Sequence, residues 1–248
     1  LGAAATDYGT LALAGGGTFD LSSLVVSGFR SYTGAGNGTT VFETLVVNQA
    51  AVDSALGNAI SGTLLQEDEL FVGLNNAVAT VGTDTVQLSG SVDFTGLRFD
   101  DNLDFVNLDF GAGNTVLFND LSATSIGSIT GTSDDDTLVV TPGSTAQDYT
   151  GRTVTDVETL LIDVTVGNEG VNVTIDEDTL TGVETITGEI DLIVSTSTAT
   201  EVVDLSGIVV TEGVDLSSAG GTALLSVTQS LLDGFSTLGA NTPLAMVM

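Results

Sequence analysis

The chain has 248 residues, of which 33 are Asp or Glu and three are Arg, and it carries a net charge of -30 without any Lys or His. Nucleic-acid binding needs a basic surface, so this composition excludes it, and it also disfavours binding to an anionic membrane. The absence of Cys and His removes disulfides, thiolate and imidazole metal ligands, and the catalytic triads and dyads that use these side chains.

The first half of the chain is rich in short β-prone runs that are separated by polar and Gly-rich turns. Strands are predicted over residues 18–26, 41–47, 70–74, 84–90, 92–99, 103–110 and 115–118. Residues 49–60 differ, because Val52, Leu56 and Ile60 recur at helical spacing and predict a short helix that covers the end of a β core. No stretch reaches the ~18 consecutive apolar residues of a membrane-spanning helix, so membrane insertion is not expected.

The second half repeats a unit that is clearest in residues 131–166. An acidic turn precedes a short apolar strand at residues 137–140, and a Pro/Gly turn leads to a second strand that contains Leu160 and Ile162. The word Val/Phe-Glu-Thr-Leu/Ile begins at positions 42, 157 and 183, and the word Val/Phe-Asp-Leu-Ser begins at positions 19, 203 and 214. A further helix is predicted near residues 231–238.

Weak self-similarity at this spacing is typical of a solenoid, in which no single coil can bury its apolar face alone. We therefore predict an all-β fold, a parallel β-solenoid (β-helix) with coils of about 20–26 residues, as a single elongated β-repeat domain over residues 1–248. Tandem antiparallel β-sandwich domains are the alternative, with a subdivision into residues 1–127 and 128–248.

The acidic turns are the candidate metal sites, because hard cations such as Ca²⁺ bind carboxylate and carbonyl oxygens. Asp134, Asp135 and Asp136 place three carboxylates directly before a strand, and sparser versions of the turn supply Asn114 and Asp84. The competing interpretation of the three consecutive Asp residues is a solvated turn. Cation binding would also offset the self-repulsion of so acidic a chain.

Catalysis is not expected, because carboxylates are the main reactive groups that the composition leaves. A glycoside hydrolase would need two of them close together, and the candidates are Asp100, Asp101 and Asp104, or Asp176, Glu177 and Asp178. Aromatic platforms for sugars are scarce, since the chain has no Trp and three Tyr. The Glu residues of the first repeated word, Glu43, Glu158 and Glu184, are interpreted as outward-facing strand positions without a binding role.

The acidic turns resemble degenerate copies of the glycine- and aspartate-rich calcium repeats of RTX (repeats-in-toxin) proteins. In this resemblance Asp135 or Asp136 takes the place of the ligand Asp and Leu138 that of the buried apolar residue. Asn114 and Val116 do so in the sparser copy. The two repeated words are similar to those of the surface-layer and adhesin proteins of Gram-negative bacteria that carry RTX-type repeats.

The resemblance implies type I secretion, calcium-dependent folding and assembly outside the cell. We therefore expect a structural, self-assembling protein of the cell surface, a surface-layer or filament subunit stabilised by Ca²⁺. Its expected partner is a further copy of itself in a homopolymer, and a cell-surface polysaccharide is a second candidate. The alternatives are a segment of a large RTX-type adhesin and, less favoured, a carbohydrate-active β-helix.

Overall fold

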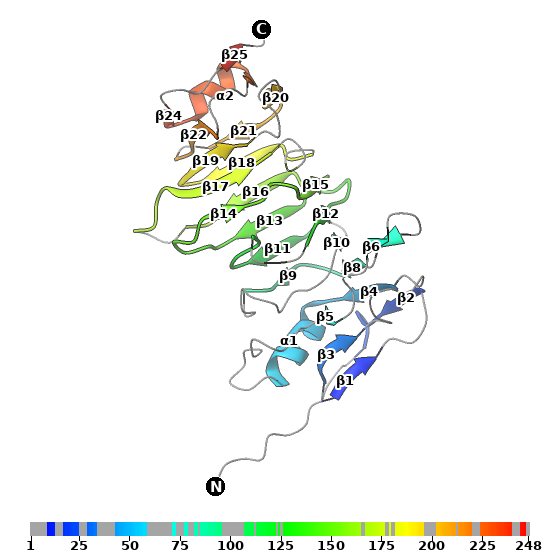
Figure 1. Ribbon diagram of the computed structural model, residues 1–248. Coiled ribbons are helices and arrows are strands. Elements are labelled where there is room, and N and C mark those ends of the chain that lie inside the picture. The colour runs from blue at the N-terminus through cyan, green and yellow to red at the C-terminus, as the bar shows by residue number, and fades with distance from the viewer. Residues whose placement is uncertain are drawn as a thin grey trace. The chain divides into compact units, whose positions relative to one another are not determined.

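In the computed structural model the chain is all-β, and its parallel strands stack as a β-solenoid (Figure 1). The predicted fold class is therefore confirmed. The structure describes residues 9–12, 17–24, 29–33, 43–58, 71–72, 77–78, 82–83, 85–95, 107–111, 113–122, 124, 126–164, 167–176, 179, 182–195, 202–211, 213–219, 224–239 and 244–246. The chain divides into two compact units, one of residues 1–111 and 123–126 and the other of residues 112–122 and 127–248.

The first unit contains two parallel sheets and a helix. One sheet has the order β2 (Gly17–Asp20), β4 (Glu43–Val47), β8 (Thr85–Leu88) and β10 (Asn107–Asp109), and the other has the order β1 (Gly9–Ala12), β3 (Phe29–Thr33) and β5 (Phe71–Val72). Helix α1 (Gln49–Asn58) packs against β3, where the buried hydroxyl of Tyr32 donates a hydrogen bond of 2.8 Å to the carbonyl of Ala51. Burial raises the pKa of Tyr32 to about 12. The remaining short strands are β6 (Ala77–Val78), β7 (Gly82–Thr83) and β9 (Val92–Asp93).

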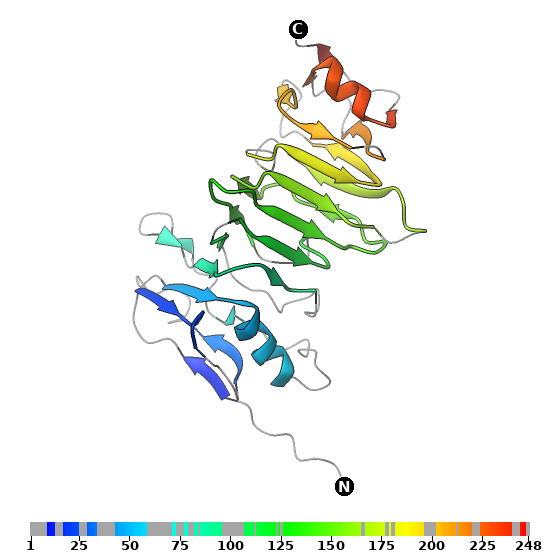
Figure 2. The same ribbon diagram turned by 180° about the vertical axis from the view of Figure 1, so that it is seen from behind.

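In the second unit, successive coils of the chain add strands to the same sheets, as the green to orange strands of Figures 1 and 2 show. The first sheet runs β11 (Thr115–Phe118), β13 (Thr137–Val140), β16 (Thr159–Ile162), β18 (Thr185–Gly188) and β21 (Val209–Val210). The second sheet runs β14 (Gln147–Asp148), β17 (Val171–Ile175), β19 (Ile190–Val194), β22 (Asp215–Ser218) and β24 (Thr237–Leu238). The other parallel pairings join β12 (Ser128–Thr130) to β15 (Thr153–Thr155), and β20 (Val202–Asp204) to β23 (Leu224–Val227) and then to β25 (Leu244–Met246).

The strands of the first sheet pair in register, so side chains at the same position of successive strands form columns that point outward or inward. Thr137 lies beside Thr159, a step of 22 residues, and Thr159 lies beside Thr185, a step of 26 residues, so the coils have the predicted length. The copy of the Glu-Thr word at position 183 therefore stacks directly on the copy at position 157. The next residue of each strand points inward and is buried, which gives the core column Val116, Leu138, Leu160, Ile186 and Val210.

Three successive coils make a very close contact at one corner of the second unit. A methyl group on Gly131 would lie 1.6 Å from the carbonyl oxygen of Asp156, and one on Gly182 would lie 2.3 Å from the backbone nitrogen of Asp156. Asp156 itself adopts a left-handed conformation with φ 53°. The N–H of Gly131 donates a hydrogen bond of 2.8 Å to the carbonyl of Thr155. Backbone therefore occupies the space that a side chain would need, and only Gly fits at positions 131 and 182.

Both predicted helices form. The one expected near residues 231–238 is α2 (Gln229–Gly234), which starts after Thr228, whose hydroxyl accepts a hydrogen bond of 3.2 Å from the N–H of Leu231. It ends earlier than predicted because Phe235 is extended, with φ -77° and ψ 140°. Residues 237–238 belong to β24 instead. Among the residues that the structure describes, neither helix has the length and apolar character needed to cross a membrane.

The strand pairs exclude the antiparallel alternative for the described part of the chain. Its pairings are parallel in both units, as for β13 with β16 and β17 with β19, and the exception is the short antiparallel pair β6 and β7. The β-sandwich prediction is therefore wrong for these strands, since a sandwich is built from hairpins that pair antiparallel.

Candidate functional site

The acidic turn between β12 and β13 holds its three carboxylates in different surroundings. Asp134 and Asp135 are exposed, whereas Asp136 is fully buried. Oδ1 of Asp136 accepts a hydrogen bond of 2.6 Å from the N–H of Asn114, one coil earlier. Oδ2 accepts bonds of 2.6 and 2.9 Å from the N–H and the hydroxyl of Thr132. The Asp136 carboxylate therefore ties its own turn to the preceding coil.

The same kind of bond recurs one coil later. The N–H of Asp136 donates a hydrogen bond of 2.7 Å to Oε2 of Glu158, which lies 22 residues further along the chain. Glu158 is partly buried, so it does more than face outward as the sequence suggested, whereas Glu184 is exposed as predicted. Asn114, Asp136 and Glu158 each precede a strand of the first sheet by one residue, and the carboxylates of Asp136 and Glu158 each accept a bond from the previous coil.

The structure brings together the two candidate metal turns around residues 114 and 134–136. A methyl group on Gly113 would lie 3.4 Å from Cβ of Asp134, so the turns stack on neighbouring coils. Asn114 is buried, and its Nδ2 atom has no hydrogen-bond partner. Asp84 lies outside the described residues. No group of three or more acidic side chains that could hold a metal ion occurs within the described ranges. The N–H of Asp134 donates a hydrogen bond of 3.1 Å to the hydroxyl of Thr132.

Asp176 was considered for a catalytic pair, and both of its carboxylate oxygens accept hydrogen bonds within the protein. Its Oδ2 accepts a hydrogen bond of 2.6 Å from the N–H of Gly151, and its Oδ1 accepts bonds of 3.0 and 2.7 Å from the N–H and the hydroxyl of Thr179. The other residues considered for this role, Asp100, Asp101, Asp104, Glu177 and Asp178, lie outside the described residues. The geometry of Asp176 is that of a coil-to-coil link.

A corner motif that sequence inspection recovered only in part uses further carboxylates. Its order is Asp, a buried apolar or aromatic residue, and Ser or Thr, and the Asp Oδ1 accepts a hydrogen bond from the Ser or Thr two residues on. Within the described ranges it occurs at Asp20 with Ser22, Asp93 with Thr95, Asp120 with Ser122, Asp148 with Thr150 and Asp204 with Ser206. The buried middle residues are Leu21, Phe94, Leu121, Tyr149 and Leu205. The repeated Val/Phe-Asp-Leu-Ser word identified the first and last copies. The copy at Asp120 was missed because Asn119 precedes it, and the other two were missed because Phe94 and Tyr149 replace the Leu.

At Asp20 and Asp204 the corner bonds stabilise the ionised carboxylate. The N–H of Ser206 and then its hydroxyl hold the pKa of Asp204 below its usual value, and in Asp20 the hydroxyl of Ser22 is the larger cause. A pKa that is lower in the folded than in the unfolded chain adds stability above the unfolded pKa. This contribution is lost as the pH falls through the folded pKa, so the corners at Asp20 and Asp204 weaken in acid.

We expect an NMR titration of the Asp204 carboxyl to give a midpoint below that of an unperturbed Asp. Ser206→Ala should move the midpoint only part of the way back, because the hydroxyl bond is lost while the stronger backbone N–H bond of 2.9 Å stays. A midpoint that Ser206→Ala leaves unchanged would contradict the assigned geometry.

Tyr149 and Arg152 of the second unit contribute to packing. Burial raises the pKa of Tyr149 far above its usual value, and it lowers the pKa of Arg152. Gln147, also buried, accepts hydrogen bonds of 3.2 Å from the N–H of Leu121 and 3.3 Å from the hydroxyl of Tyr149. Arg152 donates a bond of 3.1 Å to the carbonyl of Ser122. A neutral Tyr and a charged Arg in these surroundings do not exchange protons near neutral pH, so they do not form an acid–base pair.

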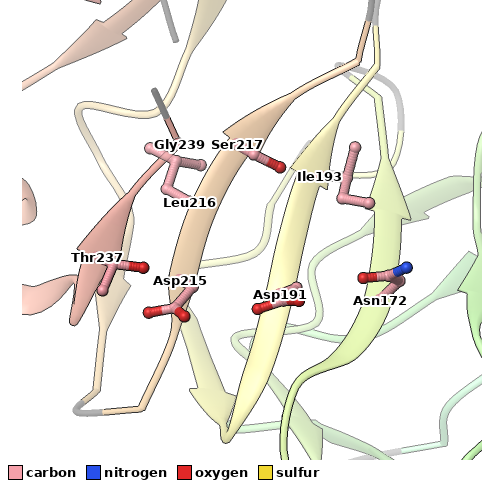
Figure 3. Close-up of a pocket in the computed structure, with 8 residues that line it drawn as sticks. All are labelled: Asn172, Asp191, Ile193, Asp215, Leu216, Ser217, Thr237 and Gly239. Carbon is pink, nitrogen blue, oxygen red and sulfur yellow. The ribbon is translucent and has the colours of Figure 1, made fainter. Parts of the chain in front are cut away.

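A pocket of about 210 Å³ lies on the second sheet (Figure 3). Asn172, Asp191, Asp215 and Thr237 form one row across it, because each is the register partner of the next on adjacent parallel strands. We call it the carboxylate pocket. The Oδ1 atom of Asp215 is buried without a hydrogen-bond partner, and Asp191 beside it is partly buried.

Among the described residues of the five strands that the second unit contributes to the first sheet, the outward positions carry no charged side chain. The first outward column is Thr at four strands and Val at the fifth: Thr115, Thr137, Thr159, Thr185 and Val209. The second outward column is aliphatic and then Thr: Leu117, Val139, Leu161, Thr187 and Thr211. We call this surface the threonine face. Exposed acids, among them Asp163 and Glu184, lie at the ends of its strands.

Comparison of the chain with models of protein families, with curated proteins and with solved structures finds no match.

Proposed function

We propose that the chain is a structural, non-catalytic subunit that assembles with copies of itself at the cell surface, as a surface layer or filament. The observation that supports this most is the threonine face. With a net charge of -30, two copies repel each other over most surfaces. A sheet face without charge is where that repulsion is weakest, so it is the surface through which copies can approach.

The composition of the threonine face also fits an interface. Interface centres are depleted in charge and are surrounded by a polar rim, and here Thr and aliphatic residues are flanked by acids such as Asp163 and Glu184. Five strands at ~4.8 Å and three residues at ~3.3 Å give a face of roughly 200 Å², well below the ~800 Å² per partner of a standard interface. A single contact is therefore weak, and association depends on many contacts in a repeated array.

The carboxylates support a structural role over a catalytic one. Asp136, Glu158 and Asp176 accept hydrogen bonds that hold turns and coils together, and the corner motif uses five further Asp residues of the described ranges in the same way. In the proposed assembly, the exposed Asp134 and Asp135 bind Ca²⁺, which relieves repulsion between acidic coils. The resemblance of this turn to RTX repeats supports that assignment.

Adding a negative charge to the threonine face tests the proposal. Thr159→Asp should abolish the rise in mass that light scattering records for the wild type at high protein concentration and millimolar calcium. Thr153→Asp, which adds the same charge at an exposed position of β15, is the control and should assemble like the wild type. Equal assembly of both variants, with unchanged circular dichroism, would rule out the threonine face as the contact, whereas a wild-type chain that stays monomeric would favour a rigid segment of a larger adhesin.

A further inference from the structure

We propose that the carboxylate pocket is a binding site for a divalent cation, held between Asp191 and Asp215. This site lies on a strand face and is separate from the acidic turn of Asp134 and Asp135. It does not depend on the proposed assembly.

The first argument comes from the partners of the buried acids. Seven Asp and Glu side chains of the described ranges are partly or fully buried. Five of them accept a hydrogen bond, namely Asp109, Asp120, Asp136, Glu158 and Asp176. The other two are Asp191 and Asp215, which share this pocket. Oδ1 of Asp215 is shielded from solvent and still has no donor. A buried oxygen without a hydrogen-bond donor costs free energy. This cost is relieved if the carboxylates bind a ligand that the protein itself does not supply.

The second argument is electrostatic. Asp191 and Asp215 are register partners on β19 and β22, and adjacent strands lie ~4.8 Å apart, so the carboxylates stand side by side on the same face (Figure 3). Like charges in this position destabilise a sheet. The chain has no Lys, and none of its three Arg residues is among the described residues that line the pocket. A cation from solution is therefore needed to neutralise the pair.

The chemistry of the pocket selects a hard cation. The polar side chains around the two carboxylates are the amide of Asn172 and the hydroxyls of Ser217 and Thr237, so oxygen donors dominate, as Ca²⁺ and Mg²⁺ prefer. Two carboxylates balance a charge of +2. A volume of about 210 Å³ also leaves room for several waters of roughly 30 Å³ each, which can complete the coordination shell.

Calorimetric titration of the full chain with calcium chloride tests the site directly. The double variant Asp191→Asn/Asp215→Asn should lose one binding event of the wild type or weaken it at least tenfold. Asp134→Asn/Asp135→Asn, which removes two charges from the acidic turn, should keep that event. If the pocket variant and the wild type give the same binding isotherm, the proposal is overturned. This outcome does not depend on calcium binding at the acidic turn or on assembly.

A second measurement distinguishes a cation site from a pair of carboxylates that does not bind a cation. In chelator, Asp215→Asn should melt at a higher temperature than the wild type, because it removes the repulsion from Asp191. In millimolar calcium the order should reverse, because the variant has lost a ligand. Asp163→Asn, at an exposed position outside the pocket, is the control and should shift the melting temperature equally in both conditions. The same sign of shift for Asp215→Asn in both conditions would contradict cation binding.

Discussion

Gly131→Ala is expected to destabilise the second unit by roughly 3–5 kcal/mol, which is close to the whole stability of many domains. The added methyl group would lie 1.6 Å from the carbonyl oxygen of Asp156. That atom belongs to the backbone of the next coil, so no side-chain rotation relieves the overlap. Relief requires that the two coils separate, which breaks the bond of 2.8 Å from the N–H of Gly131 to Thr155. Urea denaturation followed by circular dichroism measures the loss.

Gly207→Ala is the matched control for this prediction. A methyl group on Gly207 has no atom within 4 Å, and its φ does not lie in the left-handed region. The substitution should therefore be neutral or stabilising by about 0.5 kcal/mol, since Ala restricts the unfolded chain more than Gly does. If the two variants unfold at the same urea concentration, the close contact between Gly131 and the backbone of Asp156 would be contradicted.

Asp136→Ala is expected to cost roughly 3–5 kcal/mol. The carboxylate accepts three hydrogen bonds, and its removal leaves the backbone donors of Asn114 and Thr132 without their acceptor inside the protein. It also leaves a cavity between two coils. The loss should be the same in chelator and in millimolar calcium, because the carboxylate binds N–H and O–H groups of the protein.

Asp135→Ala, one residue earlier and exposed, is the control for Asp136→Ala. In chelator it should change stability by less than about 0.5 kcal/mol. In calcium it should reduce the gain in stability that the ion brings, if Asp135 is a ligand as proposed. Equal losses for the two variants in chelator would show that Asp136 is not the residue that links the coils.

The fold could be predicted because the sequence repeats in register. The words at Val157 and Val183 are 26 residues apart, and the structure pairs Thr159 with Thr185 accordingly. Strand ends were predicted too late, at residue 26 for β2 and residue 99 for β9. The chain turns there because the N–H groups of Ser22 and Thr95 donate hydrogen bonds to the carboxylates of Asp20 and Asp93. Such local side-chain bonds compete with the ladder, and hydrophobic alternation does not reveal them.

The candidate site was predictable in position but not in the roles of its residues. Alternation along a strand places residues two apart on the same side, so the buried Leu138 already implies that Asp136 points inward. Asp134 follows a turn, where that rule does not apply. The carboxylate pocket could not be foreseen, because Asp191 and Asp215 meet only through the register of β19 and β22. The Asp-Leu-Ser word also occurs in two structures, a turn at Asp204 and a continuing strand at Asp215.

Sedimentation velocity over a wide range of protein concentrations, in chelator and in millimolar calcium, tests the proposed assembly most directly. We predict a species of about the 25.0 kDa chain mass at low concentration in chelator, and growth to large assemblies as protein and calcium increase. A surface layer or filament needs more than one contact per copy, so growth should not stop at a dimer. A monomer of 25.0 kDa at every concentration and in both conditions would contradict the proposal that this chain is a self-assembling structural subunit.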